Sequence, residues 1–161
     1  MPDYEKSPKV ACFTGHRSLS GADMPLLRRW LDETITELVN RGVTRFLNGA
    51  AIGFDTIAAF MVLSQRETDP RIKLVIVQPC RNQDAKWCDE DKQAYKRLLN
   101  TADEVICLSE RYYDGCMAVR NQYLVEHSDI CVAYMKRERS GAGQTTRLAR
   151  ARGLEVINLA E

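Results

Sequence analysis

The segment Ile72-Lys73-Leu74-Val75-Ile76-Val77 is an aliphatic run that only Lys73 interrupts. A short run of this kind is typical of a central strand in a parallel sheet, because helices bury both faces of such a sheet. The polar stretch Gln78-Pro79-Cys80-Arg81-Asn82-Gln83 follows directly. We therefore predict a buried parallel strand that leads into a polar loop.

Strand-like and helix-like segments alternate on both sides of this run. Asp23 and Pro25 are typical of a helix start, and Gly42 is typical of a helix end. The predicted strands cover 9–14, 44–47, 72–77, 104–108, 130–134 and 154–159, and the remaining predicted helices cover 54–65, 84–99, 117–126 and 145–152. This alternation indicates one α/β domain over residues 1–161, with helices on both faces of a mostly parallel sheet.

Composition limits the classes of function. The chain has 161 residues, of which 45% are hydrophobic, so it can bury a core. Its 23 basic and 22 acidic residues give a net charge of +1, which argues against nucleic acid as a partner. No apolar run reaches the roughly 18 residues of a membrane span. Residues 1–9 lack the apolar core of a signal peptide. We expect a cytoplasmic protein without membrane contact.

The six cysteines indicate free thiols rather than a disulfide framework or a metal site. Cys12, Cys107 and Cys131 lie in predicted strands, where a thiol acts as a small apolar side chain. No C-x-x-C pair is present, and neither His16 nor His127 completes a zinc spacing. The sequence thus predicts no metal, and it identifies no cofactor.

Parallel α/β sheets bind their ligands beyond the carboxyl ends of the strands, so the segments that follow the strands are the candidate sites. The first such segment is Thr14-Gly15-His16-Arg17. Gly15 lets the backbone approach a ligand closely, and the guanidinium of Arg17 can bind a phosphate or a carboxylate. A plain turn with exposed His16 and Arg17 is the alternative.

The second segment is Asn48-Gly49-Ala50-Ala51-Ile52-Gly53-Phe54-Asp55. Its two glycines before a helix are compatible with an anion cradle of backbone N–H groups, although close helix–strand packing uses the same pattern. Asp55 is either the helix N-cap or a contact to a ligand hydroxyl such as that of a ribose. The chain contains neither G-x-G-x-x-G nor G-x-x-x-x-G-K-[ST], which argues against a conventional dinucleotide site or a P-loop.

The predicted helix 117–126 carries polar residues on an apolar face. Met117, Arg120, Asn121 and Leu124 share that face by their spacing. A buried arginine costs several kcal/mol unless it is paired. Arg120 therefore needs a carboxylate, which Asp55 or Asp129 could supply, or a bound anion.

Two further segments are candidates for ligand contact. Ser140-Gly141-Ala142-Gly143-Gln144-Thr145-Thr146 precedes a predicted helix and repeats the pattern of a phosphate cradle. Trp87 follows the third strand and either stacks on a base or sugar or packs against the domain.

Together these motifs resemble the YpsA-like group of the SLOG superfamily, which also contains the DprA and LOG proteins. The resemblance rests on the segments 13–17, 49–55, 79–87 and 115–121 and on the late glycine-rich turn, and it extends from Val10 to Arg152. It implies a Rossmann-like three-layer sandwich whose loops bind a nucleotide or a nucleotide-derived ligand. The ligand-binding positions that it implies are Gly15, His16, Arg17, Gly49, Gly53, Asp55, Arg120, Asn121, Gly143 and Thr145.

The LOG relatives are phosphoribohydrolases that cleave the N-glycosidic bond of nucleoside monophosphates. Their late motif P-G-G-x-G-T-x-x-E ends in a catalytic glutamate. The corresponding stretch here, residues 140–149, has neither the proline nor the glutamate. Hydrolysis of this kind would leave Asp55 as the catalytic carboxylate.

These observations support three hypotheses about function. The first is a sensor or regulatory module that binds a nucleotide, or a derivative such as ADP-ribose, without turnover. The second is a nucleoside-phosphate N-glycosidase, in which Arg17 and Arg120 hold the phosphate. The third is a DprA-like scaffold for single-stranded nucleic acid that uses the late basic residues Lys136, Arg137, Arg139, Arg147, Arg150 and Arg152. The apolar segment 54–63 adds the expectation of a homo-oligomer.

Overall fold

The computed structural model describes residues 9–160, so the expectation about an export signal concerns a segment that lies almost wholly outside the described part. The strands are β1 (Val10–Gly15), β2 (Arg45–Asn48), β3 (Lys73–Gln78), β4 (Glu104–Cys107), β5 (Ile130–Tyr134) and β6 (Glu155–Asn158). The helices are α1 (Met24–Asn40), α2 (Phe54–Arg66), α3 (Asp89–Thr101), α4 (Cys116–Glu126) and α5 (Gly141–Ala151).

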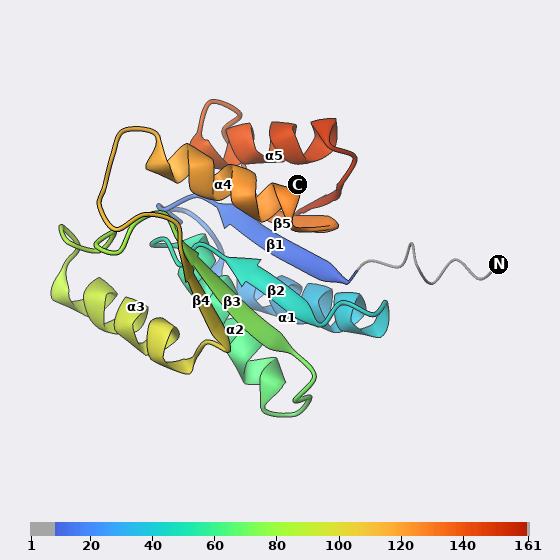
Figure 1. Ribbon diagram of the computed structural model, residues 1–161. Coiled ribbons are helices and arrows are strands. Elements are labelled where there is room, and N and C mark those ends of the chain that lie inside the picture. Colours follow the sequence, from blue (N-terminus) through green and yellow to red (C-terminus); the bar gives the residue numbers. More distant parts are fainter. Residues whose placement is uncertain (1–8, 161) are drawn as a thin grey trace.

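All the strands belong to one parallel sheet in the order β4-β3-β2-β1-β5-β6. Helices α1, α2 and α3 cover one face of this sheet, and α4 and α5 cover the other (Figure 1). The predicted Rossmann-like three-layer sandwich is therefore confirmed, and the sheet is parallel throughout the described residues. The chain builds outward from β1 to β4 and then crosses to the other side of β1, so β1 and β5 flank a topological switch point.

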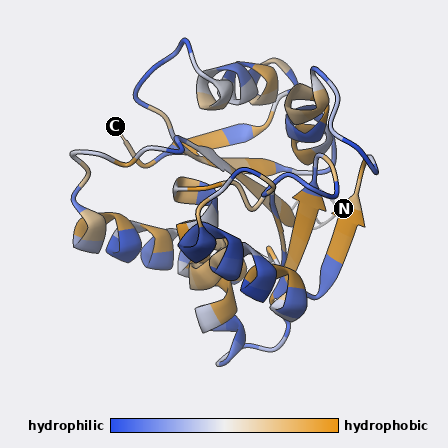
Figure 2. Ribbon diagram, turned by 90° about the vertical axis from the view of Figure 1, so that its left-hand side faces the viewer, coloured by the Kyte–Doolittle hydropathy of each residue, from blue (hydrophilic) through white to orange (hydrophobic). Residues whose placement is uncertain are grey.

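Large aromatic side chains fill the core between the sheet and the layer of α1, α2 and α3. The rings of Phe13 and Phe46 are stacked with their centroids 6.0 Å apart, and the rings of Phe54 and Tyr134 are stacked with the same centroid distance of 6.0 Å. Burying each of these rings contributes about 1.5–3 kcal/mol to stability. Figure 2 shows the hydrophobic strands enclosed by helices whose outer faces are mostly hydrophilic. No apolar residue of α2 is exposed, because the helix packs within its own chain.

Two helices begin at other residues than the sequence predicts. α3 begins at Asp89 rather than at residue 84, since residues 82–87 form successive turns closed by backbone hydrogen bonds from Ala85 and Trp87. α5 begins at Gly141 rather than at residue 145, because the side chain of Ser140 caps the helix by accepting the Gly143 N–H at 3.0 Å. This cap outweighs the low helix propensity of the glycines.

Across residues 9–160, no helix is long and apolar enough to cross a membrane.

Candidate functional site

A hollow of about 420 Å³ opens at the switch point, beyond the carboxyl ends of β1 and β5. Residues 14–18 after β1 line it, and so does Asp55 at the start of α2. α4 contributes Met117, Arg120 and Asn121, and the start of α5 contributes residues 140–142. We call this hollow the rim pocket. Segments from four parts of the chain meet here, as the strand-end argument predicts.

Arg120 is a buried cation without a carboxylate partner. Its Nη1 donates to the Gly49 carbonyl at 2.9 Å, and its Nε donates to Asn121 Oδ1 at 2.9 Å. Among the described residues, no carboxylate lies within ion-pair distance of its guanidinium. Burial lowers the pKa of Arg120, and the nearby charge of Asp55 offsets part of this shift. The guanidinium thus lines the rim pocket hydrogen-bonded by neutral groups and, among the described residues, without a carboxylate in direct contact.

Asp129 does not serve Arg120, which removes one of the two predicted carboxylate partners. Its Oδ2 accepts the backbone N–H groups of Lys9 and Val10, at 3.0 and 3.1 Å. These groups lie at the start of β1, whereas the rim pocket opens beyond the other end of that strand.

Two of the candidate glycines do not line the rim pocket, but they let the residues around it pack closely. A side chain at Gly49 would overlap the Arg120 guanidinium, so the glycine is needed for the arginine to reach the backbone. Gly53 has a φ of +87°, and a side chain there would overlap the carbonyl of Arg17. Both glycines therefore allow close packing around the pocket.

The segment between these glycines is not the open anion cradle that its pattern suggests. The Ala50 N–H donates to Asn48 Oδ1 at 2.7 Å, and the Ala51 N–H donates to Asp55 Oδ2 at 3.4 Å. Protein oxygens thus occupy the positions that an anion would take. Of the two alternatives that the pattern left open, the structure favours close packing, and the pattern does not reveal side chains that fold back onto their own loop.

Asp55 is the carboxylate of the rim pocket. It is the second residue of α2, with Gly53 at the N-cap, so it is not the cap. Its side chain is buried, and its Oδ1 has no hydrogen-bond partner among the described residues. Burial raises the pKa of Asp55 to about 6, although Arg120, the Ala51 N–H and Arg17 lower it in part. Near neutral pH the group can accept a hydrogen bond from a ligand, and below pH 6 it can donate one.

His16 positions the loop after β5. Its Nε2 accepts the backbone N–H groups of Lys136 at 2.8 Å and of Arg137 at 3.3 Å. Burial lowers the pKa of His16, and the charges of Arg137 and Lys136 lower it further, so the ring is neutral at pH 7. The imidazole lines the rim pocket, but its acceptor nitrogen is already engaged by the backbone.

The start of α5 faces the rim pocket with its first turn. The N–H groups of Gly141 and Ala142 belong to that turn and have no acceptor within the helix. Gly143 and Thr145 are buried inside α5 and do not line the pocket; the Thr145 hydroxyl donates to the Gly141 carbonyl at 2.9 Å. The lining positions therefore lie one to five residues earlier than the predicted ones, a shift that Ser140 could have indicated as an N-cap residue.

Arginines outnumber carboxylates around the rim pocket. Arg17 and Arg137 line it as exposed side chains, in addition to buried Arg120. Asp55 is the one carboxylate among its described lining residues. Three guanidinium groups and a helix N-terminus against one carboxyl group of raised pKa make the hollow electrostatically suited to an anion.

Solved structures share this fold. The chain superimposes on DNA processing protein A from Helicobacter pylori with a TM-score of 0.61 and 19% identity, covering 97% of this chain and 67% of that protein. For DNA processing protein A from Streptococcus pneumoniae the TM-score is 0.65 at 20% identity, covering 96% of this chain and 50% of that protein. At these identities the likeness establishes the fold alone.

The expectation that net charge argues against nucleic acid is wrong. The H. pylori protein, which has the same fold, is described as binding single-stranded DNA in a unique mode. A net charge near zero also conceals a local excess of charge, because the basic side chains of the β5–α5 region are all exposed. Total charge is therefore no guide to partners in a fold of this kind.

Sequence relatives cover most of the chain. An uncharacterised SPbeta prophage-derived protein, YoqJ of Bacillus subtilis strain 168, is 33% identical over 120 residues, which are 66% of this chain and 70% of that protein. A UPF0398 protein of Halalkalibacterium halodurans is 27% identical over 143 residues, which are 83% of this chain and 76% of that protein. The family model described as the YspA SLOG family (YpsA) matches residues 12–152. The chain therefore belongs to the YpsA family of SLOG proteins.

Proposed function

We propose that the rim pocket binds the phosphate group of a nucleotide or nucleotide-derived ligand. The observation that carries this proposal is Arg120, a buried guanidinium that has no carboxylate within ion-pair distance and lines a hollow of about 420 Å³. A bound phosphate supplies the missing negative charge. Arg17 and the first-turn N–H groups of α5 contact the same hollow and add donors.

A sugar phosphate fits the pocket better than a bare anion. The hollow is within the range of small-molecule sites, about 300–1,000 Å³. The unpartnered Oδ1 of Asp55 is an acceptor suited to a ribose hydroxyl.

We assign the pocket to binding rather than to turnover. Glycoside hydrolysis generally uses two carboxyl groups, and Asp55 is the only one among the described residues that line the pocket. Its remaining charged side chains are arginines, which hold phosphate. A sensor or regulatory module is the role that this composition supports. We also propose a cytoplasmic location, in keeping with the buried free thiols Cys12 and Cys131.

Titration calorimetry with inorganic phosphate, ribose 5-phosphate and AMP tests the proposal. Arg17→Ala is the informative variant, since Arg17 is exposed and its loss leaves the core intact. We expect about tenfold weaker binding of all three compounds, because a hydrogen bond to a charged group is worth about 1.5–3 kcal/mol. Arg29→Ala, an exposed arginine on α1, is the matched control and should bind like the parent.

If the parent protein binds none of the three compounds, the proposal fails. It also fails if Arg17→Ala and Arg29→Ala bind with equal affinity. Free adenine released from AMP by the parent, and not by Asp55→Asn, would assign turnover to the pocket instead of binding alone.

Single-stranded nucleic acid is the second candidate. The fold shared with a single-stranded DNA-binding protein favours it. So does the exposed basic set Lys136, Arg137, Arg139, Arg147, Arg150 and Arg152. Polarisation of a labelled oligo(dT) measured over a salt series tests it, and binding should weaken steeply as salt rises. Affinity that does not change with salt, or no binding at low salt, would contradict this candidate.

A further inference from the structure

We propose that a second hollow, which adjoins the rim pocket, is a subsite for a nucleobase that carries an exocyclic amine. The second hollow measures about 620 Å³ and shares Arg17 and Met117 with the rim pocket. Asn82, Gln83, Lys86, Trp87 and Tyr112 complete its main lining. This inference rests on the proposed phosphate site, because that site anchors the other end of the ligand.

Two aromatic rings give the second hollow a surface on which a base can stack. Trp87 is partly buried and meets the Tyr95 ring edge-on at 5.2 Å, so its position is fixed by the domain. Tyr112 is 58% exposed and lines the same hollow. Stacking of a base on an aromatic side chain is worth about 1–3 kcal/mol. Trp87 thus both packs against the domain and faces a cavity, so the two predicted alternatives for it are compatible.

Gln83 contributes an unused acceptor. The residue is buried, and its Nε2 donates to the Gly49 carbonyl at 3.1 Å and to the Tyr95 hydroxyl at 3.0 Å. Its Oε1 has no partner among the described residues. A buried acceptor left unsatisfied is costly, and the amine of adenine or cytosine would satisfy it once the atoms that cover the oxygen move aside. Hypoxanthine presents a carbonyl oxygen in place of the adenine amine and would not.

One backbone carbonyl links the two hollows. The Gly49 oxygen accepts both Arg120 Nη1 from the rim pocket and Gln83 Nε2 from the second hollow. The phosphate-binding guanidinium and the base-binding amide are therefore held in a fixed relation by a single rigid group. A ligand with a phosphate at one end and an aromatic amine at the other matches this arrangement. A free nucleoside phosphate and the 5′ end of a single strand both offer that chemistry.

Comparing ligands that differ by one chemical group provides the test. Titration calorimetry of the parent protein should show AMP binding at least about tenfold more tightly than ribose 5-phosphate, owing to stacking, and more tightly than IMP. We call the ratio of the affinity for AMP to the affinity for ribose 5-phosphate the AMP advantage. In Tyr112→Ala this AMP advantage should fall several-fold, while ribose 5-phosphate binds as before. Tyr113→Ala is the matched control, because Tyr113 is the adjacent, 44% exposed tyrosine and does not line the hollow.

The outcomes separate this inference from the proposed phosphate site. If ribose 5-phosphate binds and AMP binds no better, the base subsite is overturned and the phosphate site stands. If Tyr112→Ala leaves the AMP advantage unchanged, the base lies elsewhere and the inference is also overturned. Equal affinities for AMP and IMP overturn the requirement for an amine. If no phosphate compound binds, the proposed function itself fails.

A further titration with 5′-phosphorylated oligo(dA) distinguishes the two sources of the ligand. Tighter binding of the oligomer than of AMP, lost in Tyr112→Ala, assigns the subsite to a base within a strand. Equal or weaker binding of the oligomer assigns it to a free nucleotide. Both results support the base subsite, whereas tighter binding of the oligomer that Tyr112→Ala leaves unchanged counts against it.

Discussion

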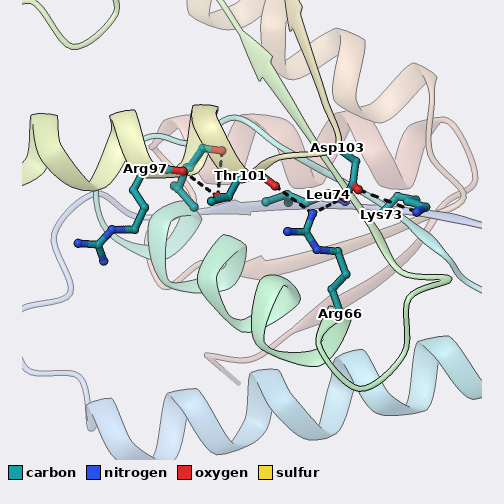
Figure 3. Close-up of polar contacts among 7 residues, drawn as sticks. Arg66, Lys73, Leu74, Arg97, Thr101 and Asp103 are labelled. Atoms are coloured by element: carbon teal, nitrogen blue, oxygen red, sulfur yellow. Dashed lines mark hydrogen bonds and ion pairs between the residues drawn. The ribbon is translucent and has the colours of Figure 1, made fainter.

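A carboxyl group at the amino end of the sheet and a carboxyl group at the carboxyl end differ in how many partners they have. At the amino end, Asp103 Oδ2 accepts Arg66 Nη1 at 2.7 Å and the Leu74 N–H at 2.8 Å (Figure 3). At the carboxyl end, Asp55 has one oxygen without a partner and no ion pair among the described residues. Groups that stabilise the fold are saturated within the chain, whereas groups at the candidate site leave part of their bonding capacity unused.

The pKa values of these two carboxyl groups move in opposite directions. Burial alone would raise the pKa of Asp103, but the Leu74 N–H and the Arg66 guanidinium outweigh burial, and the net shift is downward. At Asp55 burial dominates and raises the pKa to about 6. Perturbed acids that lie in a hollow are typical of functional sites.

Other pairs extend the contrast. Arg45 and Glu104 meet at 2.9 Å and Arg41 and Glu155 meet at 2.7 Å, and each of these pairs ties the amino end of a strand to another part of the chain. Arg17, at the opposite end of the sheet, has no such partner among the described residues. The contrast belongs to the rim pocket and not to the whole carboxyl edge of the sheet, since Arg81 and Glu110 meet at 2.7 Å beyond β3 and β4.

Replacing Asp103 should give the largest loss of stability. Asp103→Ala leaves the Leu74 N–H without its acceptor and Arg66 with the Thr101 carbonyl alone. We therefore expect the free energy of unfolding to fall by about 2–4 kcal/mol. Urea unfolding followed by circular dichroism measures this. Glu33→Ala, on an exposed helix face, is the control and should change stability by less than about 0.5 kcal/mol. If Asp103→Ala is as stable as that control, the contrast between the two ends does not hold.

Replacing Asp55 should act in the opposite direction. Its pKa of about 6 lies above the ordinary value of 3.8, so the folded chain binds the proton more tightly than the unfolded chain. Stability from this group is therefore present below about pH 4 and is lost as pH rises to 6. We expect Asp55→Asn to stabilise the protein by about 1–3 kcal/mol at pH 7.5 and to make no such gain at pH 4.

Denaturant unfolding of Asp55→Asn at both pH values checks this prediction. The pH dependence of stability has the opposite sign at Asp103. Because folding lowers the pKa of Asp103, its contribution to stability is present at neutral pH and is lost as the pH falls through the pKa of the folded state. A destabilised Asp55→Asn protein at pH 7.5 would show that the carboxylate serves the fold and would remove the distinction between the two ends.

Replacing Lys73 should have the smallest effect. Lys73 Nζ lies 4.0 Å from Asp103 Oδ1, and the lysine side chain is 52% exposed. Exposed pairs contribute about 0–1 kcal/mol, so Lys73→Ala should cost less than about 0.5 kcal/mol. The measurement is the shift in urea midpoint relative to Asp103→Ala. A loss comparable to that of Asp103→Ala would show that Lys73, rather than Arg66 and the backbone, holds the carboxylate.

The order of strands and helices could be predicted from local patterns. The run at residues 72–77 became β3, displaced by one residue, and the Asp23 cap was confirmed because Asp23 Oδ1 accepts the Leu26 N–H at 3.1 Å. Hydrophobic spacing and cap residues act over a few neighbours, and they are therefore visible in the sequence. The start of α5 was missed because the Ser140 cap was overlooked among the glycines.

The meeting of segments 14–18, 55 and 117–121 at one rim also followed from the sequence, because parallel strands all end at the same edge of their sheet. Only the tertiary structure decided which charges are paired. Arg120 binds a carbonyl 71 residues away at Gly49, and Asp129 caps the start of β1 rather than pairing with Arg120. Partner choice depends on distances between remote segments and on how much water each group loses, and neither quantity is encoded in the neighbours of a residue.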